Sequence, residues 1–258
     1  MVKFYTSQCC NNYPIITGVL DRHLFGGALN QILIARYQQM IQNVNTPYGQ
    51  WGNNNIPGCN IVNGKNSAGK NLKDVQLQVP LGMVPALVKY GTYFNLGHDL
   101  PFWIERDTDD KIMLVSQDPL RNSQARGVLT LSTPFGMHSI DYRGNKVYTQ
   151  IIAGLLQGGC SVYLTDCHKL YATNKQDNPS RTPSIITGPN DAQILKEEIE
   201  FFDPSKIVAI GKKAEQLLIG MGYKPLTVPH PGAILPKSKF APFTRKVDWY
   251  INEIINHP

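Results

Sequence analysis

Apolar runs and helical repeats of apolar residues alternate along the second half of the chain. Four runs have the length of a buried strand and predict strands over 112–115, 161–165, 206–210 and 226–228. A further run at 127–131 predicts a short strand or a loop. Apolar residues at helical spacing predict helices over 145–156, 191–202, 213–221 and 246–255. This alternation is typical of α/β proteins, so we expect a three-layer α/β/α sandwich with a mainly parallel central sheet.

The helix predicted over 191–202 has an apolar face. Four of its residues recur at helical spacing and are expected to point inward: Ile194, Leu195, Ile199 and Phe202. We expect Asp191 and the charged residues 196–198 to face solvent.

The first half of the chain has weaker periodicity. Apolar residues between Leu29 and Ile41 fall at helical spacing, whereas residues 43–71 are dense in Asn and Gly and predict a long loop. Residues 77–100 are apolar with Gly and Pro breaks, which suggests short helices. We expect residues 1–105 to form a helical and loop extension packed on an α/β core at 106–258, the two making one structural domain.

Composition is that of a globular protein with an excess of basic residues. The chain has 258 residues, of which 42% are hydrophobic and 17% are charged, and its formal net charge is +6. The positive charge suits a polyanionic partner such as nucleic acid, although many basic proteins bind none. No apolar stretch approaches the roughly 18 residues of a membrane span, so we expect no membrane partner.

The five cysteines do not form a framework. An odd number at irregular spacing favours reduced thiols and a cytoplasmic location. Cys160, Cys167 and His168 lack the Cys-x-x-Cys spacing of a zinc site, and the adjacent Cys9 and Cys10 do not suit an iron–sulfur cluster. We therefore expect no metal and no other cofactor.

Ionisable side chains follow the predicted strands. Asp118 comes directly after the first strand, which Pro119 ends, and Asp166 with Lys169 follows the second. Gly211–Lys213 follows the third strand and His230 the last. Carboxyl ends of parallel strands meet at one edge of a sheet, where α/β proteins bind ligands. Two carboxylates and a histidine could converge there, and the alternative is that each is an ordinary cap or solvated loop residue.

Several of these segments resemble motifs of one enzyme family. The segment 116–119, Ser-Gln-Asp-Pro, closely resembles the Gly-Gln-Asp-Pro-Tyr-His motif of the uracil-DNA glycosylases. The segment 124–127, Gln-Ala-Arg-Gly, looks like their Gln-Ala-His-Gly, and 230–232, His-Pro-Gly, stands where the family has His-Pro-Ser. Order and spacing agree from about residue 110 to 255, while residues 1–105 show no clear match. The chain thus resembles a divergent member of the uracil-DNA glycosylase superfamily, which implies that family's fold.

The resemblance implies roles for particular residues. Asp118 would position the attacking water, and His230 would donate a hydrogen bond to the departing base as negative charge develops on it. The residues expected to bind the substrate base are Gln117, Leu120, Phe135 and Asp166. The residues expected to contact DNA are Arg121, Lys169 and Lys212, with Ile234 or Leu235 filling the space that a flipped base leaves.

The chain also departs from the family pattern. The base-reading Asn of the family is Asp166 here, and an ionised carboxylate can only accept hydrogen bonds. Uracil is therefore disfavoured unless Asp166 is protonated, and a base with an exocyclic amine or two N–H donors would suit an ionised Asp166 better. Leu120 replaces a Tyr that excludes thymine, and Thr130 falls near a stacking Phe whose place Phe135 could take. Gly232 removes a phosphate-binding hydroxyl.

These features predict a monomeric DNA glycosylase-like hydrolase that takes part in base excision repair. It would remove a damaged or non-standard base from single- or double-stranded DNA by hydrolysing the N-glycosidic bond. Two alternatives remain open: a non-catalytic nucleic-acid-binding module with the same fold, and an enzyme acting on a free nucleoside or nucleotide.

Overall fold

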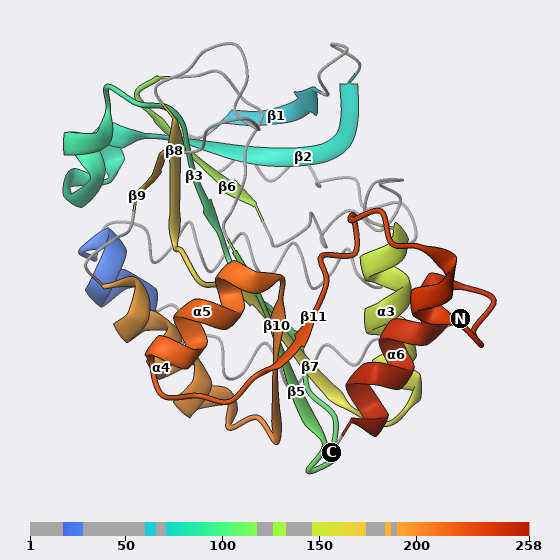
Figure 1. Ribbon diagram of the computed structural model, residues 1–258. Helices are drawn as coiled ribbons and strands as arrows, with labels where there is room; N and C mark the ends of the chain where they lie inside the picture. Colours follow the sequence, from blue (N-terminus) through green and yellow to red (C-terminus); the bar gives the residue numbers. More distant parts are fainter. Residues whose placement is uncertain are drawn as a thin grey trace.

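The α/β fold is confirmed. The computed structural model describes residues 18–27, 60–65, 71–117, 126–132, 146–173, 184–186 and 190–257 (Figure 1). Its central five-stranded sheet has the order β11-β10-β5-β7-β4. The strands are β4 (Phe102–Ile104), β5 (Lys111–Ser116), β7 (Ser161–Asp166), β10 (Lys206–Ile210) and β11 (Leu226–Val228). The helix predicted within 29–41 lies outside the described residues.

The central sheet is mixed rather than mainly parallel throughout. Strands β11, β10, β5 and β7 are parallel, as predicted, but β4 runs antiparallel to β7 at the edge. β5 and β7 are almost entirely buried, which explains why their sequences are continuous apolar runs instead of alternating ones.

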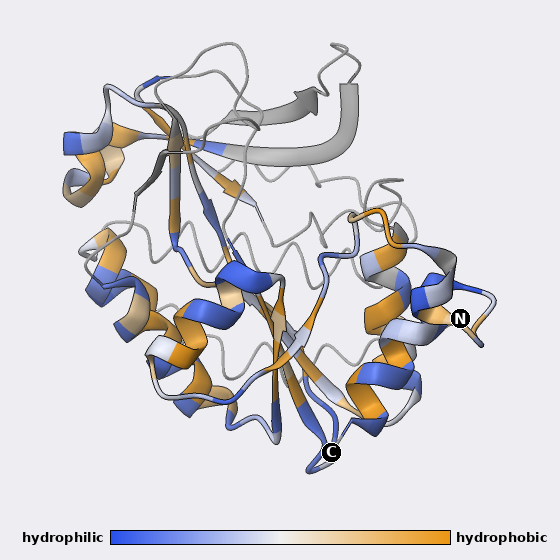
Figure 2. Ribbon diagram, viewed as in Figure 1, coloured by the Kyte–Doolittle hydropathy of each residue, from blue (hydrophilic) through white to orange (hydrophobic). Residues whose placement is uncertain are grey.

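Two pairs of helices cover the two faces of this sheet. Helices α3 (Lys146–Gln157) and α6 (Lys246–Asn256) lie on one face, and α4 (Asp191–Phe202) and α5 (Lys212–Gly220) on the other (Figure 1). Each begins and ends within one or two residues of the predicted bounds. Strands and inward helix faces carry most of the hydrophobic residues in this part of the molecule (Figure 2). The three layers are therefore held by apolar burial.

A second, six-stranded sheet was not predicted. Its order is β1-β2-β6-β3-β8-β9, and most of its neighbours are antiparallel. The strands are β1 (Asn60–Lys65), β2 (Asn71–Pro80), β3 (Phe94–Asp99), β6 (Val128–Ser132), β8 (Leu170–Thr173) and β9 (Ser184–Ile186). Where a loop was expected over 43–71, residues 60–65 form a strand. Over 77–100 only η2 (Leu81–Met83) and η3 (Pro85–Tyr90) are helical, both of the 3-10 type.

The alternation of apolar and polar residues in β2 was the signal for this sheet. Val75, Leu77 and Val79 are separated by single polar residues, which is the period of a strand. The division into an extension at 1–105 and a core at 106–258 stays a prediction, although β4, within the first range, hydrogen-bonds to β7 of the central sheet. The remaining described helical segments are η1 (Asp21–Phe25) and η6 (Lys237–Phe240).

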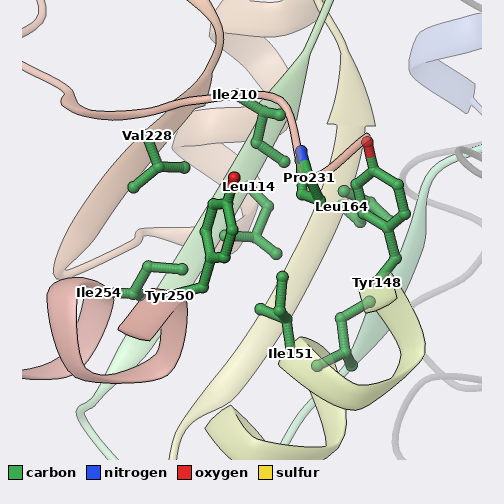
Figure 3. Close-up of a pocket in the computed structure, with 10 residues that line it drawn as sticks. Leu114, Tyr148, Ile151, Leu164, Ile210, Val228, Pro231, Tyr250 and Ile254 are labelled. Atoms are coloured by element: carbon green, nitrogen blue, oxygen red, sulfur yellow. The ribbon is translucent and has the colours of Figure 1, made fainter. Parts of the chain in front are cut away.

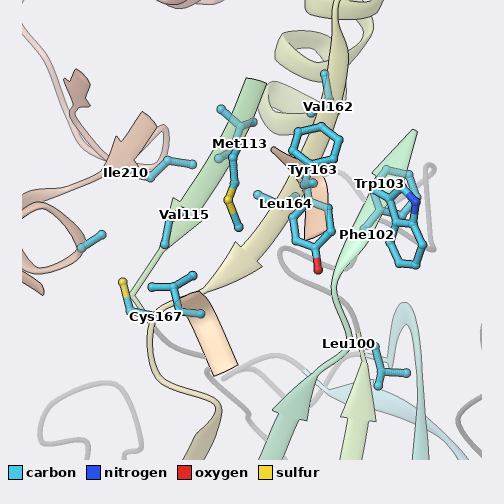
Figure 4. Close-up of a cluster of buried hydrophobic side chains, with 14 of the residues drawn as sticks. Leu100, Phe102, Trp103, Met113, Val115, Val162, Tyr163, Leu164, Cys167 and Ile210 are labelled. Atoms are coloured by element: carbon cyan, nitrogen blue, oxygen red, sulfur yellow. The ribbon is translucent and has the colours of Figure 1, made fainter. Parts of the chain in front are cut away.

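Two antiparallel segments join the sheets. β3 and β4 are separated by two residues and pair with β8 and β7, so each chain segment passes from one sheet into the other. On the central side, the Trp103 and Tyr163 rings stack with centroids 5.7 Å apart (Figure 4). Phe201 and Phe202 of α4 close over these rings. This aromatic cluster fixes the edge strand β4 against β7.

Helices α3 and α6 approach each other closely at glycine. A Cβ atom on Gly154 would lie 2.1 Å from Cδ1 of Ile251, and one on Gly158 would lie 2.8 Å from Cδ1 of Ile255. The absence of a side chain at these positions lets the two helices pack at short range. None of the described helices is both long enough and apolar enough to cross a membrane.

We expect Gly154→Ala to lower the free energy of unfolding. The added methyl group must displace Ile251, and overpacking of this kind costs about 1–3 kcal/mol, more than the roughly 1 kcal/mol that alanine gains over glycine in a helix. Gly220→Ala in α5 is the matched control, because its Cβ would meet nothing within 4 Å. Urea unfolding of both variants measures this, and a stabilised Gly154→Ala protein would contradict the close packing.

Candidate functional site

The ends of four neighbouring parallel strands meet at one edge of the central sheet. Gln117 follows β5, Asp166 ends β7, Gly211 follows β10, and His230 lies two residues beyond β11. We call this edge the crevice. Asp118 directly follows Gln117 but lies outside the described residues, as do Leu120, Arg121 and Phe135. The four strand ends share one edge, as a parallel arrangement predicts, and the roles of these residues stay predictions.

Asp166 is buried at the carboxyl end of β7. It lies opposite Ser116 in the parallel register of β5 and β7, and the Ser116 hydroxyl donates a hydrogen bond to its Oδ1. Both residues are about 3% exposed. A carboxylate this deep in the protein is held by its neighbours in one orientation, so it can serve as a fixed acceptor at the crevice.

The turn after β7 is attached to the turn after β5. The Cys167 N–H donates to the Ser116 carbonyl at 2.8 Å, and the His168 N–H donates to the Gln117 carbonyl at 3.0 Å. These bonds extend the pairing of the two strands beyond their ends. They fix the backbone of Gln117, from which the chain continues into Asp118.

Lys169 lies inside the protein rather than on its surface. Its ammonium group donates to Glu198 Oε2 at 2.6 Å, to Thr165 Oγ1 at 2.9 Å and to the Asp166 carbonyl at 2.7 Å. Both charged side chains are at most 2% exposed. The prediction that Lys169 contacts DNA is therefore wrong, because its ammonium group is buried and paired with Glu198.

The prediction for the polar residues of α4 also needs correction. Glu198 and Asp191 are buried, whereas both were expected to face solvent. Asp191 accepts from the Lys169 N–H and lies 3.2 Å from His168 Nδ1. Burial raises the pKa of Glu198, and the Lys169 charge opposes that rise.

Hydrogen bonds with Gly232 and Tyr148 hold the ring of His230. The Gly232 N–H donates to Nδ1 at 3.0 Å, so Nδ1 is the acceptor nitrogen and the proton of the neutral ring is on Nε2. Nε2 lies 2.7 Å from the hydroxyl of Tyr148, a residue in the first turn of α3. His230 thus has the tautomer of a hydrogen-bond donor at Nε2.

The surroundings of His230 favour its neutral form. Partial burial of the ring, and then the positive charge of Lys246, lower the pKa of His230 below its ordinary value. Burial strongly raises the pKa of the Tyr148 phenol, and the charges of Tyr250 and Asp166 raise it further. The phenol therefore stays protonated, and it lies within electrostatic range of Asp166 on one side and in contact with His230 on the other.

The loop after His230 exposes an apolar side chain. Ile234 is 100% exposed and Leu235 is partly buried. Lys212 is exposed at the start of α5, where Gly211 makes the tight turn from β10 with a φ of 91° that favours glycine. The exposed side chains of Ile234 and Lys212 thus lie at the same edge of the sheet as His230.

A small apolar cavity lies beneath this loop. Its volume is about 10 Å³, and it is lined by Tyr148 of α3, Tyr250 of α6, Pro231 and apolar residues of the sheet (Figure 3). That is roughly the space of one water molecule, so the cavity is a packing gap and not a binding site for a base. Within the described ranges, no cluster of His, Cys, Asp and Glu could hold a metal ion.

Sequence reasoning missed three residues of this region. Tyr148 lies within the helix predicted over 145–156, and no role was predicted for its hydroxyl, which reaches His230. Glu198 was assigned to solvent, although it lies four residues after Ile194 and four before Phe202, within the inward stripe. Ser116 was read only as part of a motif. For Glu198 the helical spacing was the available signal, while Tyr148 and Ser116 gain meaning only from tertiary neighbours.

We expect Lys169→Met to destabilise the protein strongly. Removing one partner leaves Glu198 buried without its cation, and breaking a buried pair in this way costs about 3–5 kcal/mol. Lys196→Met is the matched control, because Lys196 makes an exposed pair with Glu200 at 3.8 Å, worth about 0–1 kcal/mol. Denaturant unfolding compares the two, and equal effects would contradict the importance of the buried pair.

A comparison with family models gives one match. Residues 104–256 match the model of the uracil DNA glycosylase superfamily. The matched range begins at the last residue of β4 and ends with α6, so it contains the four parallel strands of the central sheet and the four helices around them. No individual curated protein and no solved structure matches the chain significantly.

Proposed function

The chain belongs to the uracil DNA glycosylase superfamily, and from this we propose that it is a DNA glycosylase that hydrolyses the bond between a damaged or non-standard base and its deoxyribose. The observation that carries the proposal is the joint position of the described strand ends: a buried carboxylate, a neutral histidine and an exposed isoleucine at one edge of the sheet. The family acts on DNA, and the exposed Lys212 at this edge suits the phosphate backbone.

Asp118 is the proposed water-positioning residue. Breaking the N-glycosidic bond builds positive charge on the sugar, which a carboxylate stabilises while it orients the attacking water. This role rests on the resemblance of residues 116–119 to the family motif. It is supported by the hydrogen bonds that fix Gln117 at the crevice.

His230 is the proposed donor to the departing base. Negative charge develops on a base oxygen as the bond breaks, and a preorganised N–H aimed at that oxygen stabilises it. The Nε2–H tautomer and the lowered pKa of His230 support this role, because the neutral ring donates from Nε2. In the protein alone Nε2 lies 2.7 Å from the Tyr148 hydroxyl, and the base oxygen would take the place of that partner.

Asp166 is the proposed reader of the base edge. Its carboxylate accepts hydrogen bonds and repels carbonyl oxygens, so it favours a base with an exocyclic amine over uracil. The Ser116 hydroxyl already donates to Oδ1, which supports the view that Asp166 acts as an acceptor. Gln117, Leu120 and Phe135 remain proposed substrate contacts.

Ile234 is proposed to fill the space left by a flipped base. Extruding a base costs a few kcal/mol, and an apolar side chain placed in the gap offsets part of that cost. The complete exposure of Ile234, in the loop that follows His230, supports this role, and Leu235 is the neighbouring alternative. Arg121 is a further proposed phosphate contact.

The test is base release from an oligonucleotide panel. We expect the wild-type protein to release an amine-bearing modified base faster than uracil, and Asp118→Asn to slow release by at least about 100-fold while DNA affinity persists. Asp109→Asn is the matched control, because Asp109 is exposed at the opposite end of β5. Free base is measured by mass spectrometry and affinity by fluorescence anisotropy.

Each other outcome excludes part of the proposal. DNA binding without release of any base would favour a non-catalytic module with the glycosylase fold. Release from free nucleosides, with no binding of DNA, would favour an enzyme of nucleoside metabolism.

A further inference from the structure

The first turn of α6 holds the loop that carries His230. Lys246 donates from its ammonium group to the carbonyl of Pro231 at 2.8 Å and also to the carbonyl of Ala233. On the same helix, the Tyr250 hydroxyl donates to the Pro229 carbonyl at 2.9 Å. Carbonyls on both sides of His230 are therefore fastened to one helix.

Backbone N–H groups of the loop itself also hold His230. The Gly232 N–H donates to Nδ1, and the Ala233 N–H donates to the His230 carbonyl at 2.8 Å. Protonation of Nδ1 would place two donors against each other, so the folded loop requires the neutral ring. The two carbonyls bound by Lys246 belong to the residues that flank Gly232, so Lys246 acts on the segment that sets the tautomer.

The charges around His230 come from two helices. From α3, the ring meets the Tyr148 phenol, which is held protonated. From α6 it faces the charge of Lys246, whose own pKa is lowered by partial burial, while Tyr250 lies beneath the loop. Arg245, the exposed N-cap residue of α6, donates from Nε to the partly exposed Asp248 in the first turn at 2.8 Å. Lys246 is thus the nearby cation on α6 that is turned toward the His230 loop.

We propose that Lys246 is a positioning residue for the reaction at the crevice: it clamps residues 231–233, and through them it holds the His230 ring with Nδ1 accepting from the Gly232 N–H and the proton on Nε2. In this role Lys246 acts through the loop and not by contact with the base. An effect of Lys246 on base release rests on the proposed function, whereas its hold on the His230 loop can be tested in the protein alone. The same contacts also fix the backbone just before Ile234, because Ile234 directly follows Ala233, whose carbonyl Lys246 binds.

The test is a titration of His230 by NMR in the full-length protein without DNA. In Lys246→Met, we expect the pKa of His230 to rise toward its ordinary value, because a neighbouring positive charge is lost and the loop loosens. We also expect the Gly232 amide to lose protection from hydrogen exchange. Lys246→Gln keeps a donor for the carbonyls without the charge, so the pKa should rise while more of the Gly232 protection remains.

Arg245→Met is the matched control. It removes one positive charge from the adjacent residue, but the Arg245 guanidinium is exposed and paired with Asp248 of its own helix, so the titration and the Gly232 amide should stay as in the wild type. An unchanged His230 pKa and Gly232 protection in Lys246→Met would overturn the proposal, as would an equal shift in Arg245→Met. If Lys246→Met does not fold, the comparison of Lys246→Gln with Arg245→Met decides in the same way.

Base release by these variants separates the two proposals. If the chain is a glycosylase, Lys246→Met should slow release by about 10-fold or more with little change in KM, because His230 acts on the developing charge. If no variant and not even the wild type releases a base, the proposed function fails, and the titration still tests the clamp.

Discussion

The buried ion pair between Lys169 and Glu198 is the interaction on which the rest of the structure depends. It lies where β7 of the central sheet continues into β8 of the second sheet, and the Lys169 carbonyl accepts a hydrogen bond from Nδ1 of His98 in β3 at 2.6 Å. One residue therefore joins α4, both sheets and the end of β7. Such pairs are costly to bury, and they persist only when all partners are satisfied. Here the satisfied pair fixes the backbone at Asp166.

The crevice has two supports that differ in character. On the β5–β7 side, Asp166 is held by a rigid network of buried hydrogen bonds that reaches from Ser116 to Glu198. On the β11 side, His230 lies in a loop held by side chains of α3 and α6, which pack closely at Gly154. The carboxylate is thus part of the core, while the histidine and Ile234 stand on a surface loop whose position follows the helix pair.

The sequence predicted the central sheet and its helices well, because buried parallel strands and amphipathic helices leave strong local patterns. It did not predict the second sheet, apart from a possible short strand at 127–131, where β6 lies. Asn, Gly or Pro occur in β1, β2 and β3, and the strands of this sheet are recognised mainly by their pairing. The predicted strand ends placed Asp166 and His230 at the same edge of the sheet, where the structure has them. The pairing of Lys169 with Glu198 could not be read from local pattern, because it joins residues 29 positions apart on a strand end and a helix. The contact of Tyr148 with His230 was hidden for the same reason.

In the proposed function, the crevice at the carboxyl edge of the sheet is where DNA binds. The most direct measurement is NMR mapping of isotope-labelled protein with a duplex that contains a stable abasic-site analogue. We expect the amide signals of Asp166, Gly211, Gly232 and Ile234 to shift, while those of Asp109 and Ser205, at the opposite edge of the sheet, stay unchanged. Shifts confined to the opposite edge, or no shifts at saturating duplex, would contradict the account.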